Sequence, residues 1–318
     1  MIHATRSPEI ERVTREVEGL VANIERVIIG KRPVVDLAVS ALLAGGHVLL
    51  QDVPGVGKTM LARALTRSIG GAYKRVQGTP DLLPGDITGG MVYDPSRGTL
   101  RFVPGPIFAN VVLADELNRT TPRTQSAFME AMDEGQVSIE GAAYPLPKPF
   151  YLIATLNPTE HHGTYPLPEG QLDRFLISAS LGYPARDQEV EVVARQQQAH
   201  PIDSLQVVTE LSRVLDWQQM VRRVHVDHSL VVYGVALVTA TRGHADAALG
   251  ASPRASLGLV RLAQAWALCR GRDFVLPDDV KALAPAVLSH RIIPRSRVPA
   301  VVIIQEILDR TAVPVLAP

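Results

Sequence analysis

The chain of 318 residues contains a single cysteine, Cys269, and only 5% aromatic residues. With one cysteine, no disulfide can form within the chain, which favours a reducing compartment. The chain also lacks net charge, because 32 Lys and Arg residues balance 32 Asp and Glu residues. No overall charge therefore attracts a nucleic acid or an anionic membrane, and nucleic-acid binding would need a local basic patch.

Long hydrophobic runs are missing as well. The longest runs, such as residues 229–240 (SLVVYGVALVTA), fall short of the ~20 residues that a membrane-spanning helix needs. The first thirty residues mix charged and apolar side chains and lack the apolar core of a signal peptide. We therefore expect a cytoplasmic protein without a membrane span, whose 46% hydrophobic residues form an ordinary aliphatic core.

The first half of the chain alternates short apolar runs with helical segments. Strands are expected at residues 47–53, 110–114, 150–156 and 175–181, and helices at 8–27 and 58–69. A further helix is expected after Pro33 and should end at Gly45-Gly46, because glycine accepts the left-handed conformation found at helix ends. This alternation is typical of a parallel sheet covered by helices, so residues 1–184 are predicted to form an α/β domain.

From residue 185 onward the strand signals fade and helical spacing takes over, as at 187–199, 254–270 and 298–310. Residues 185–318 are therefore predicted to form an all-helical domain. Its core should include the apolar stripe of residues 259, 262, 263 and 266. Residues 78–106, rich in glycine and proline, are expected to be a loop or short hairpin inserted in the first domain. An insertion of that length commonly has a function.

The stretch DVPGVGKTM, Asp52 to Met60, follows a predicted strand and precedes a predicted helix. This is the context of a phosphate-binding loop, G-x-x-x-x-G-K-[ST], whose backbone N–H groups wrap phosphates at a helix N-terminus. Lys58 is expected to reach the terminal phosphates and Thr59 to ligate Mg²⁺. The remaining nucleotide-binding residues expected in this loop are Pro54, Gly55, Val56, Gly57 and Met60. The alternative is a glycine-rich turn with an exposed lysine.

Asp52 stands where the phosphate-loop pattern has its first glycine. That position mainly sets the turn that leaves the strand, and aspartate is among the residues that tolerate turn conformations. We therefore expect the exchange to cost little and the loop to bind nucleotide.

Polar side chains end two further predicted strands. Asp115 is expected to hold Mg²⁺ through its water shell, and Glu116 to take a proton from the attacking water. Asn157 can orient that water beside the γ-phosphate without competing for its charge. A solvated strand end and a turn-forming asparagine before Pro158 are the alternative interpretations.

The chain resembles the MoxR family of AAA+ ATPases, in the branch that also holds magnesium chelatase and the MCM helicases. The resemblance is carried by DVPGVGKT, TPDLLPGDITG, FVPGPIFANVVLADELNRTTPRTQSAFMEAM, LIATLNPTEHHGTYPLPEGQLDRF and SPRAS. These motifs cover most of the first 180 residues and part of the second half. The resemblance implies an AAA+ P-loop NTPase core with a parallel sheet, a helical lid, and ATP or ADP with Mg²⁺ in the cleft between them.

By this resemblance, Lys58 and Thr59 belong to the Walker A motif and Asp115 and Glu116 to Walker B. Asn157 falls in the sensor-1 position.

Four further positions take their expected roles from the resemblance. Arg174 in QLDRF matches the arginine finger that completes the site of a neighbouring subunit, and Arg254 in SPRAS matches sensor 2 of the lid. Ile29 and Gly30 match residues near the adenine. For Arg174, which follows Asp173, a simple ion pair is the alternative.

The resemblance also implies a homo-oligomeric ring, expected to be a hexamer, and a client protein, in relatives often one that bears a von Willebrand factor A domain. Residues 78–106 match the helix-2 insert and 134–150 the pre-sensor-1 hairpin, which relatives project toward a central channel. A channel for nucleic acid needs clustered basic and aromatic residues. Here the hairpin has one lysine against two glutamates, and the insert has Arg97 and Arg101 against three aspartates.

We therefore expect ATP hydrolysis that remodels or matures client proteins, without nucleic acid. A nucleic-acid-stimulated motor ATPase and a nucleotide-gated scaffold with little turnover are the alternatives.

Overall fold

The computed structural model describes residues 8–157, 164–198 and 201–315. Its α/β part contains a five-stranded sheet in which every pair of neighbouring strands is parallel. In spatial order the strands are β2 (Tyr73–Gln77), β5 (Val111–Asp115), β8 (Tyr151–Leu156), β1 (Val48–Gln51) and β9 (Ile177–Ala179). The predicted parallel sheet is confirmed, and four of its strands fall within the predicted ranges, β5 extending to Asp115.

The sequence did not predict β2, which forms one edge of the sheet. Its residues YKRVQ bury only Val76, so the strand has no apolar run that would mark it.

Each face of the sheet has its own hydrophobic core, because successive strand residues point to opposite faces. Val48 and Leu50 of β1 join the cluster beneath α1 (Pro8–Glu25), α2 (Arg32–Leu43) and α3 (Lys58–Ser68). Leu49 joins the other cluster, which includes Phe128 of α5 (Pro122–Glu134). The sheet is therefore covered on both faces.

The first three helices begin and end close to the predicted positions. Gly45 has φ +67° directly after α2, as expected for a glycine that ends a helix.

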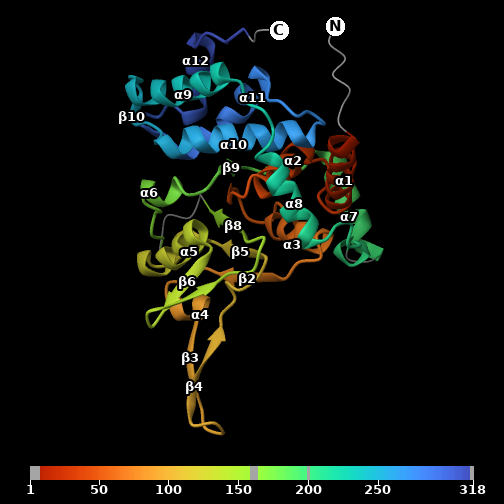
Figure 1. The fold of residues 1–318 in the computed structure, drawn as a ribbon, viewed down its shortest axis with the longest axis vertical. Coiled ribbons are helices and arrows are strands. Elements are labelled where there is room, and N and C mark those ends of the chain that lie inside the picture. Colours follow the sequence, from red (N-terminus) through yellow and green to blue (C-terminus); the bar gives the residue numbers. More distant parts are fainter. Residues whose placement is uncertain (1–7, 158–163, 199–200, 316–318) are drawn as a thin grey trace.

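The second half is mostly helical, as predicted. Its helices are α7 (Arg186–Gln198), α8 (Leu211–Val221), α9 (His228–Gly243), α10 (Pro253–Cys269), α11 (Pro277–Leu288) and α12 (Ala300–Arg310), with 3-10 turns η2 (Pro201–Ser204) and η3 (Ser289–Arg291). A short antiparallel pair, β10 (Ala247–Leu249) with β11 (Ile293–Pro294), was not expected. Figure 1 shows α9 to α12 gathered at the end of the molecule opposite the hairpin of β3 (Gly89–Asp94) and β4 (Thr99–Pro104).

The predicted apolar stripe lies on α10. Leu259, Leu262 and Ala263 are fully buried, and Trp266 packs against the same cluster. That cluster also contains residues of α1, α2 and β1, so the helical part and one face of the sheet share a continuous core. Within the described residues, no helix is long and apolar enough to cross a membrane.

The insertion contains a short helix, α4 (Pro84–Thr88), and an antiparallel hairpin of β3 (Gly89–Asp94) and β4 (Thr99–Pro104). Figure 1 shows this hairpin extending away from the body of the molecule. A second hairpin, β6 (Gln136–Ile139) with β7 (Ala142–Pro145), lies at its base. The rings of Phe102 and Tyr144 join the two hairpins at a centroid distance of 4.1 Å.

Candidate functional site

The phosphate-loop stretch lies between β1 and α3, where two glycines have left-handed conformations. Gly55 has φ +84° and Gly57 has φ +100°, and a Cβ added to either would meet no atom within 4 Å. The backbone, and not a lack of space, requires glycine at these positions. Gly57 is the N-cap of α3 and offers no side-chain cap. The first N–H groups of α3 therefore lack a side-chain partner.

A cavity of about 370 Å³ opens in front of this helix end. It is lined by the loop, by the ends of β5 and β8, and by one residue of β2. The lining residues are Pro54, Gly55, Gly57, Lys58, Thr59, Met60, Arg75, Asp115, Glu116 and Asn157. The carboxyl ends of adjacent parallel strands meet at one edge of the sheet, which brings together residues that are far apart in the sequence. All of these except Arg75 were candidate site residues in the sequence.

The Lys58 side chain turns back onto its own loop. Its ammonium group donates to the backbone carbonyls of Asp52 at 2.8 Å and Val53 at 3.1 Å.

The carboxylate of Asp115 is held from two sides. The hydroxyl of Thr155 on β8 donates to Oδ1 at 2.7 Å and itself accepts from the Glu116 N–H at 2.8 Å. The guanidinium of Arg75 donates to Oδ2 through Nε at 3.1 Å and Nη2 at 2.6 Å. Arg75 and Thr155 thus fix the orientation of a carboxylate whose side chain is 11% exposed.

Glu116 has φ +55°, which is uncommon for a residue with a side chain. Its Oε2 accepts from Nε2 of Gln77 at 2.8 Å and from Nη1 of Arg119 at 3.0 Å. Nη2 of Arg75 also donates to Oε1 of Gln77. A chain of hydrogen bonds therefore joins Asp115, Arg75, Gln77 and Glu116.

Arg75 and Gln77 had no signal in the sequence, because β2 itself was not recognised. Alternating residues of a strand share a face. A correct prediction of β2 would therefore have placed the side chains of Arg75 and Gln77 together on one face of the sheet.

A second cavity of about 170 Å³ adjoins the first and shares Gly55, Gly57 and Met60 with it. Its other lining residues are mostly apolar: Val27, Ile28, Ile29, Lys31, Val56, Pro184, Val192, Arg195 and Pro201. Ile29 and Val56 are thus placed as candidates for contact with a base. The sequence did not suggest Val192 and Arg195, because α7 had been assigned to the other domain.

Gly30 does not line either cavity. It has φ +69°, and a Cβ there would lie 2.1 Å from the amide nitrogen of Gln188 on α7. The positive φ therefore favours glycine at this turn before α2, and the Gln188 side chain of α7 lies close to it.

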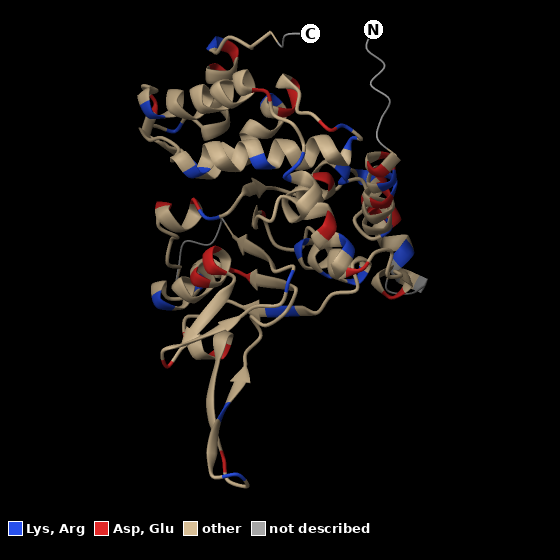
Figure 2. Cartoon of the chain, viewed as in Figure 1, with Lys and Arg blue, Asp and Glu red and all other residues tan. Residues whose placement is uncertain are grey.

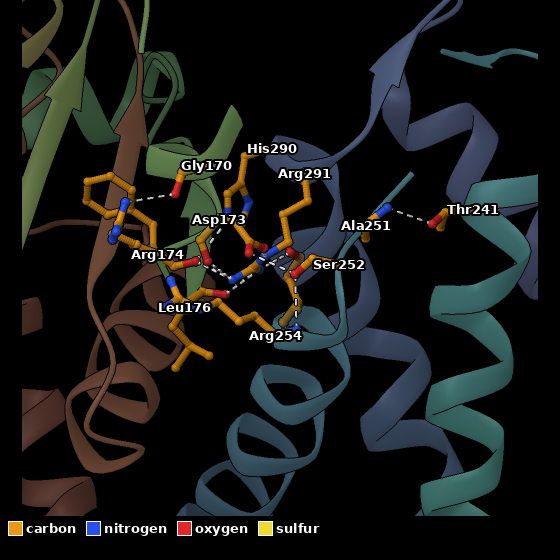
Figure 3. A network of polar contacts seen from close by, with 12 residues as sticks. Gly170, Asp173, Arg174, Leu176, Thr241, Ala251, Ser252, Arg254, His290 and Arg291 are labelled. Atoms are coloured by element: carbon orange, nitrogen blue, oxygen red, sulfur yellow. Dashed lines mark hydrogen bonds and ion pairs between the residues drawn. The ribbon is translucent and has the colours of Figure 1, made fainter. Parts of the chain in front are cut away.

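Arg174 and Arg254 lie together and away from both cavities. Arg174 Nε donates to Oδ2 of Asp133 at 2.5 Å, and Nη2 of Arg254 lies 3.5 Å from the same oxygen. Arg174 also donates to the carbonyl of Gly170, as Figure 3 shows. The structure therefore does not place Arg254 beside Lys58 in the same chain. Arg174 thus forms an ion pair within its own chain, as the alternative interpretation proposed, and its partner is Asp133, whereas Asp173 pairs with Arg291.

Asp173 instead joins the α/β part to the helical part (Figure 3). Nε of Arg291 donates to its Oδ1 at 2.9 Å, and the hydroxyl of Ser252 donates to Oδ2 at 2.8 Å. The Arg291 side chain, 3% exposed, also donates to the carbonyls of Phe175 at 2.6 Å and Leu176 at 3.1 Å. This network fixes the start of α10, which carries Arg254, relative to Arg174.

Asp52 is buried and forms more than a turn. Its carboxylate accepts from the Ser180 hydroxyl at 2.7 Å, the Leu181 N–H at 2.5 Å and the Gly182 N–H at 3.0 Å. The side chain connects the start of the phosphate loop to the segment after β9. Turn propensity alone therefore did not reveal that the Asp52 carboxylate accepts three hydrogen bonds.

Comparison with known proteins agrees with this architecture. Residues 47–177 match the model of the ATPase family associated with various cellular activities (AAA), and residues 239–317 match the AAA lid domain. A suspected ATPase from Cytophaga hutchinsonii has a solved structure with TM-score 0.90 and 35% identity, covering 96% of this chain and 97% of that one.

Named relatives give the family. The chain is 48% identical to the uncharacterised protein YeaC of Bacillus subtilis over 93% of this chain and 94% of YeaC. It is 42% identical to Chaperone MoxR1 of Mycobacterium tuberculosis over 87% of this chain and 75% of that protein. It is 30% identical to Protein MoxR of Methylorubrum extorquens over 85% of each chain. The chain belongs to the MoxR family of AAA+ ATPases.

Proposed function

We propose that this protein binds ATP with Mg²⁺ in the two joined cavities and hydrolyses it to remodel or mature a client protein. The observation that carries the proposal is the convergence of the phosphate loop, Asp115, Glu116 and Asn157 on one cavity of about 370 Å³. The name of the relative Chaperone MoxR1 supports a chaperone-like role.

The residues fit a magnesium nucleotide. The start of α3, without a side-chain cap, presents N–H groups and the positive end of the helix dipole, which suit a phosphate. The Thr59 hydroxyl and the Asp115 carboxylate supply oxygen atoms of the kind that Mg²⁺ prefers. The adjoining apolar cavity with Ile29 and Val56 suits a flat base.

Bound Mg²⁺ would neutralise charge on the phosphates. In the proposed reaction, Glu116 accepts a proton from the water that attacks the γ-phosphorus, and Asn157 orients that water. Lys58 neutralises the negative charge that moves onto the β–γ bridging oxygen as the bond to the γ-phosphorus breaks. The products are ADP and inorganic phosphate.

We propose that copies of the chain form a ring, expected to be a hexamer. Arg174 of one subunit would approach the γ-phosphate held by the next, and Arg254 would lie beside it. Their common position at Asp133, outside the cavities of their own chain, supports a role toward a neighbour. Their side chains are 29% and 51% exposed, so both can be reached.

The proposed contact with the client is the hairpin of β3 and β4. Tyr93 and Leu100 are opposite each other in its register and are 60% and 58% exposed. Figure 2 shows few charged residues along this hairpin and both signs near its tip. This surface suits an apolar protein segment better than a nucleic acid. We also propose that the client bears a von Willebrand factor A domain. The protein itself is proposed to be cytoplasmic.

The proposal is tested by measuring ATP binding and steady-state hydrolysis for the wild type and for Glu116→Gln and Lys58→Ala. Glu116→Gln is expected to retain ATP binding and lose about 100-fold or more in turnover, because it removes the proton acceptor. Lys58→Ala should lose binding. Normal turnover by Glu116→Gln would contradict the assignment.

The same assay separates the alternatives. Turnover that rises steeply on addition of DNA or RNA, and falls with salt, would favour a nucleic-acid motor. Lys58-dependent ATP binding with almost no turnover in the wild type would favour a nucleotide-gated scaffold.

A further inference from the structure

We propose that Arg75 is a nucleotide-sensing residue that distinguishes ATP from ADP by exchanging partners. Without nucleotide it pairs with Asp115, and with ATP bound it moves to the γ-phosphate. The inference rests on the proposed function, since it concerns the same site.

The contacts at Asp115 motivate the exchange. An ionised carboxylate offers about two acceptor positions on each oxygen. On Asp115, both positions of Oδ2 accept from Arg75 and one position of Oδ1 accepts from Thr155. A hydrated cation that needs this carboxylate must therefore compete with the guanidinium for most of its acceptor positions.

Electrostatics favour departure of Arg75 when a divalent cation arrives. The Asp115 side chain is only 11% exposed, so solvent screens two positive groups beside it poorly. The Arg75 side chain is 48% exposed and comes from the edge strand, so it is free to change rotamer. The side-chain hydrogen bonds that hold it in place go to Asp115 and to Gln77 of the same strand.

The same cavity offers Arg75 a new partner. Arg75 lines it together with Lys58 and Thr59, where the terminal phosphates would lie. A guanidinium fork matches a phosphate as well as a carboxylate and binds it with charge-assisted hydrogen bonds. ADP has no γ-phosphate, so it would displace Arg75 from Asp115 without offering this compensation. The exchange should therefore favour ATP over ADP.

A purely structural role makes a different prediction. If Arg75 only neutralises Asp115, its removal should change the affinities for ATP and ADP by the same factor.

The test compares the affinities of a non-hydrolysable β,γ-imido ATP analogue and of ADP by calorimetry, at saturating Mg²⁺. In Arg75→Gln we expect affinity for the analogue to fall about tenfold, the equivalent of one lost charge-assisted hydrogen bond. Affinity for ADP should stay within about twofold or increase, because Asp115 is freed. Arg75→Lys should keep part of the preference for the analogue.

Lys74→Gln is the matched control. It removes one positive charge from the same strand, but adjacent strand residues point to opposite faces, so both affinities should remain those of the wild type.

A second measurement is binding of Mn²⁺ to the nucleotide-free protein, followed by electron paramagnetic resonance. Arg75→Gln should bind Mn²⁺ more tightly than the wild type.

Equal losses for the analogue and ADP in Arg75→Gln, or an equal effect of Lys74→Gln, would overturn the inference. A wild-type protein that binds neither nucleotide in a Lys58-dependent way would instead overturn the proposed function itself.

Discussion

Replacing Asp52 by glycine restores the common phosphate-loop pattern and provides a sharp test of the structure. Turn propensity alone predicts a neutral or beneficial change. The structure predicts a loss of stability, because the carboxylate accepts three hydrogen bonds from the segment after β9.

The magnitude follows from the surroundings of the three donors. The N–H of Leu181 belongs to a residue that is 3% exposed, and leaving such a donor without a partner costs about 1–3 kcal/mol. Ser180 is exposed and Gly182 is half-buried, so water can replace their partner and each lost bond costs about 0.5–1.5 kcal/mol. Glycine adds about 0.5–1 kcal/mol of backbone entropy. We expect Asp52→Gly to destabilise the fold by about 2.5–7 kcal/mol.

Thermal unfolding measures this loss. For a chain of 318 residues, the expected change corresponds to a decrease in Tm of about 4–10 °C. Asp52→Asn, which keeps one acceptor oxygen but turns an amide toward the donors, should lose about half as much. Ser180→Ala removes only the exposed partner and serves as the control, with a loss of about 1 kcal/mol. A Tm of Asp52→Gly within about 1 °C of the wild type would refute this account.

Two further predictions concern pH and assembly. Burial lowers the pKa of His47 to about 4 and, together with the Arg291 charge, that of His290 to about 3. Both imidazoles stay neutral in the folded protein, but in the unfolded chain they become protonated below about pH 6.5. The free energy of unfolding should therefore be unaffected by these histidines above that pH. Below it, each histidine should lower the free energy of unfolding by up to about 1.4 kcal/mol per pH unit. Denaturant unfolding at pH 7.0 and 5.5 measures this; equal stabilities would contradict it, and His47→Gln should reduce the difference. For the ring, Arg174→Ala and Lys58→Ala should each be inactive, but mixing them should restore some ATP hydrolysis, since a mixed ring contains interfaces with both intact residues. No recovery at any ratio would argue against a finger acting on the neighbouring subunit.

The sequence alone was enough to identify site residues that belong to a short motif or lie at the end of an apolar strand. The phosphate loop is local, and its strand, glycines, lysine and following helix lie within about twenty residues. Asp115 and Asn157 were found because each follows an apolar strand, and buried parallel strands have a clear signal. The parallel sheet was predicted for the same reason, and the mostly helical second half was predicted from apolar residues at helical spacing. The domain boundary at residue 184 remains a prediction.

The tertiary structure alone decided which polar residues meet. Arg75 and Gln77 lie on an edge strand with one buried residue, where an apolar pattern is absent. Arg254 joins Arg174 at Asp133 because Asp173, next to Arg174, binds both Ser252 at the start of α10 and the buried Arg291. The SPRAS motif alone does not reveal these long-range contacts. Asp52 appeared to be a turn residue because its three partners are distant in sequence. Short-range patterns specify elements and their chemistry, whereas long-range packing determines hydrogen-bond partners, and it is these partners that distinguish a tolerated substitution from a structural requirement.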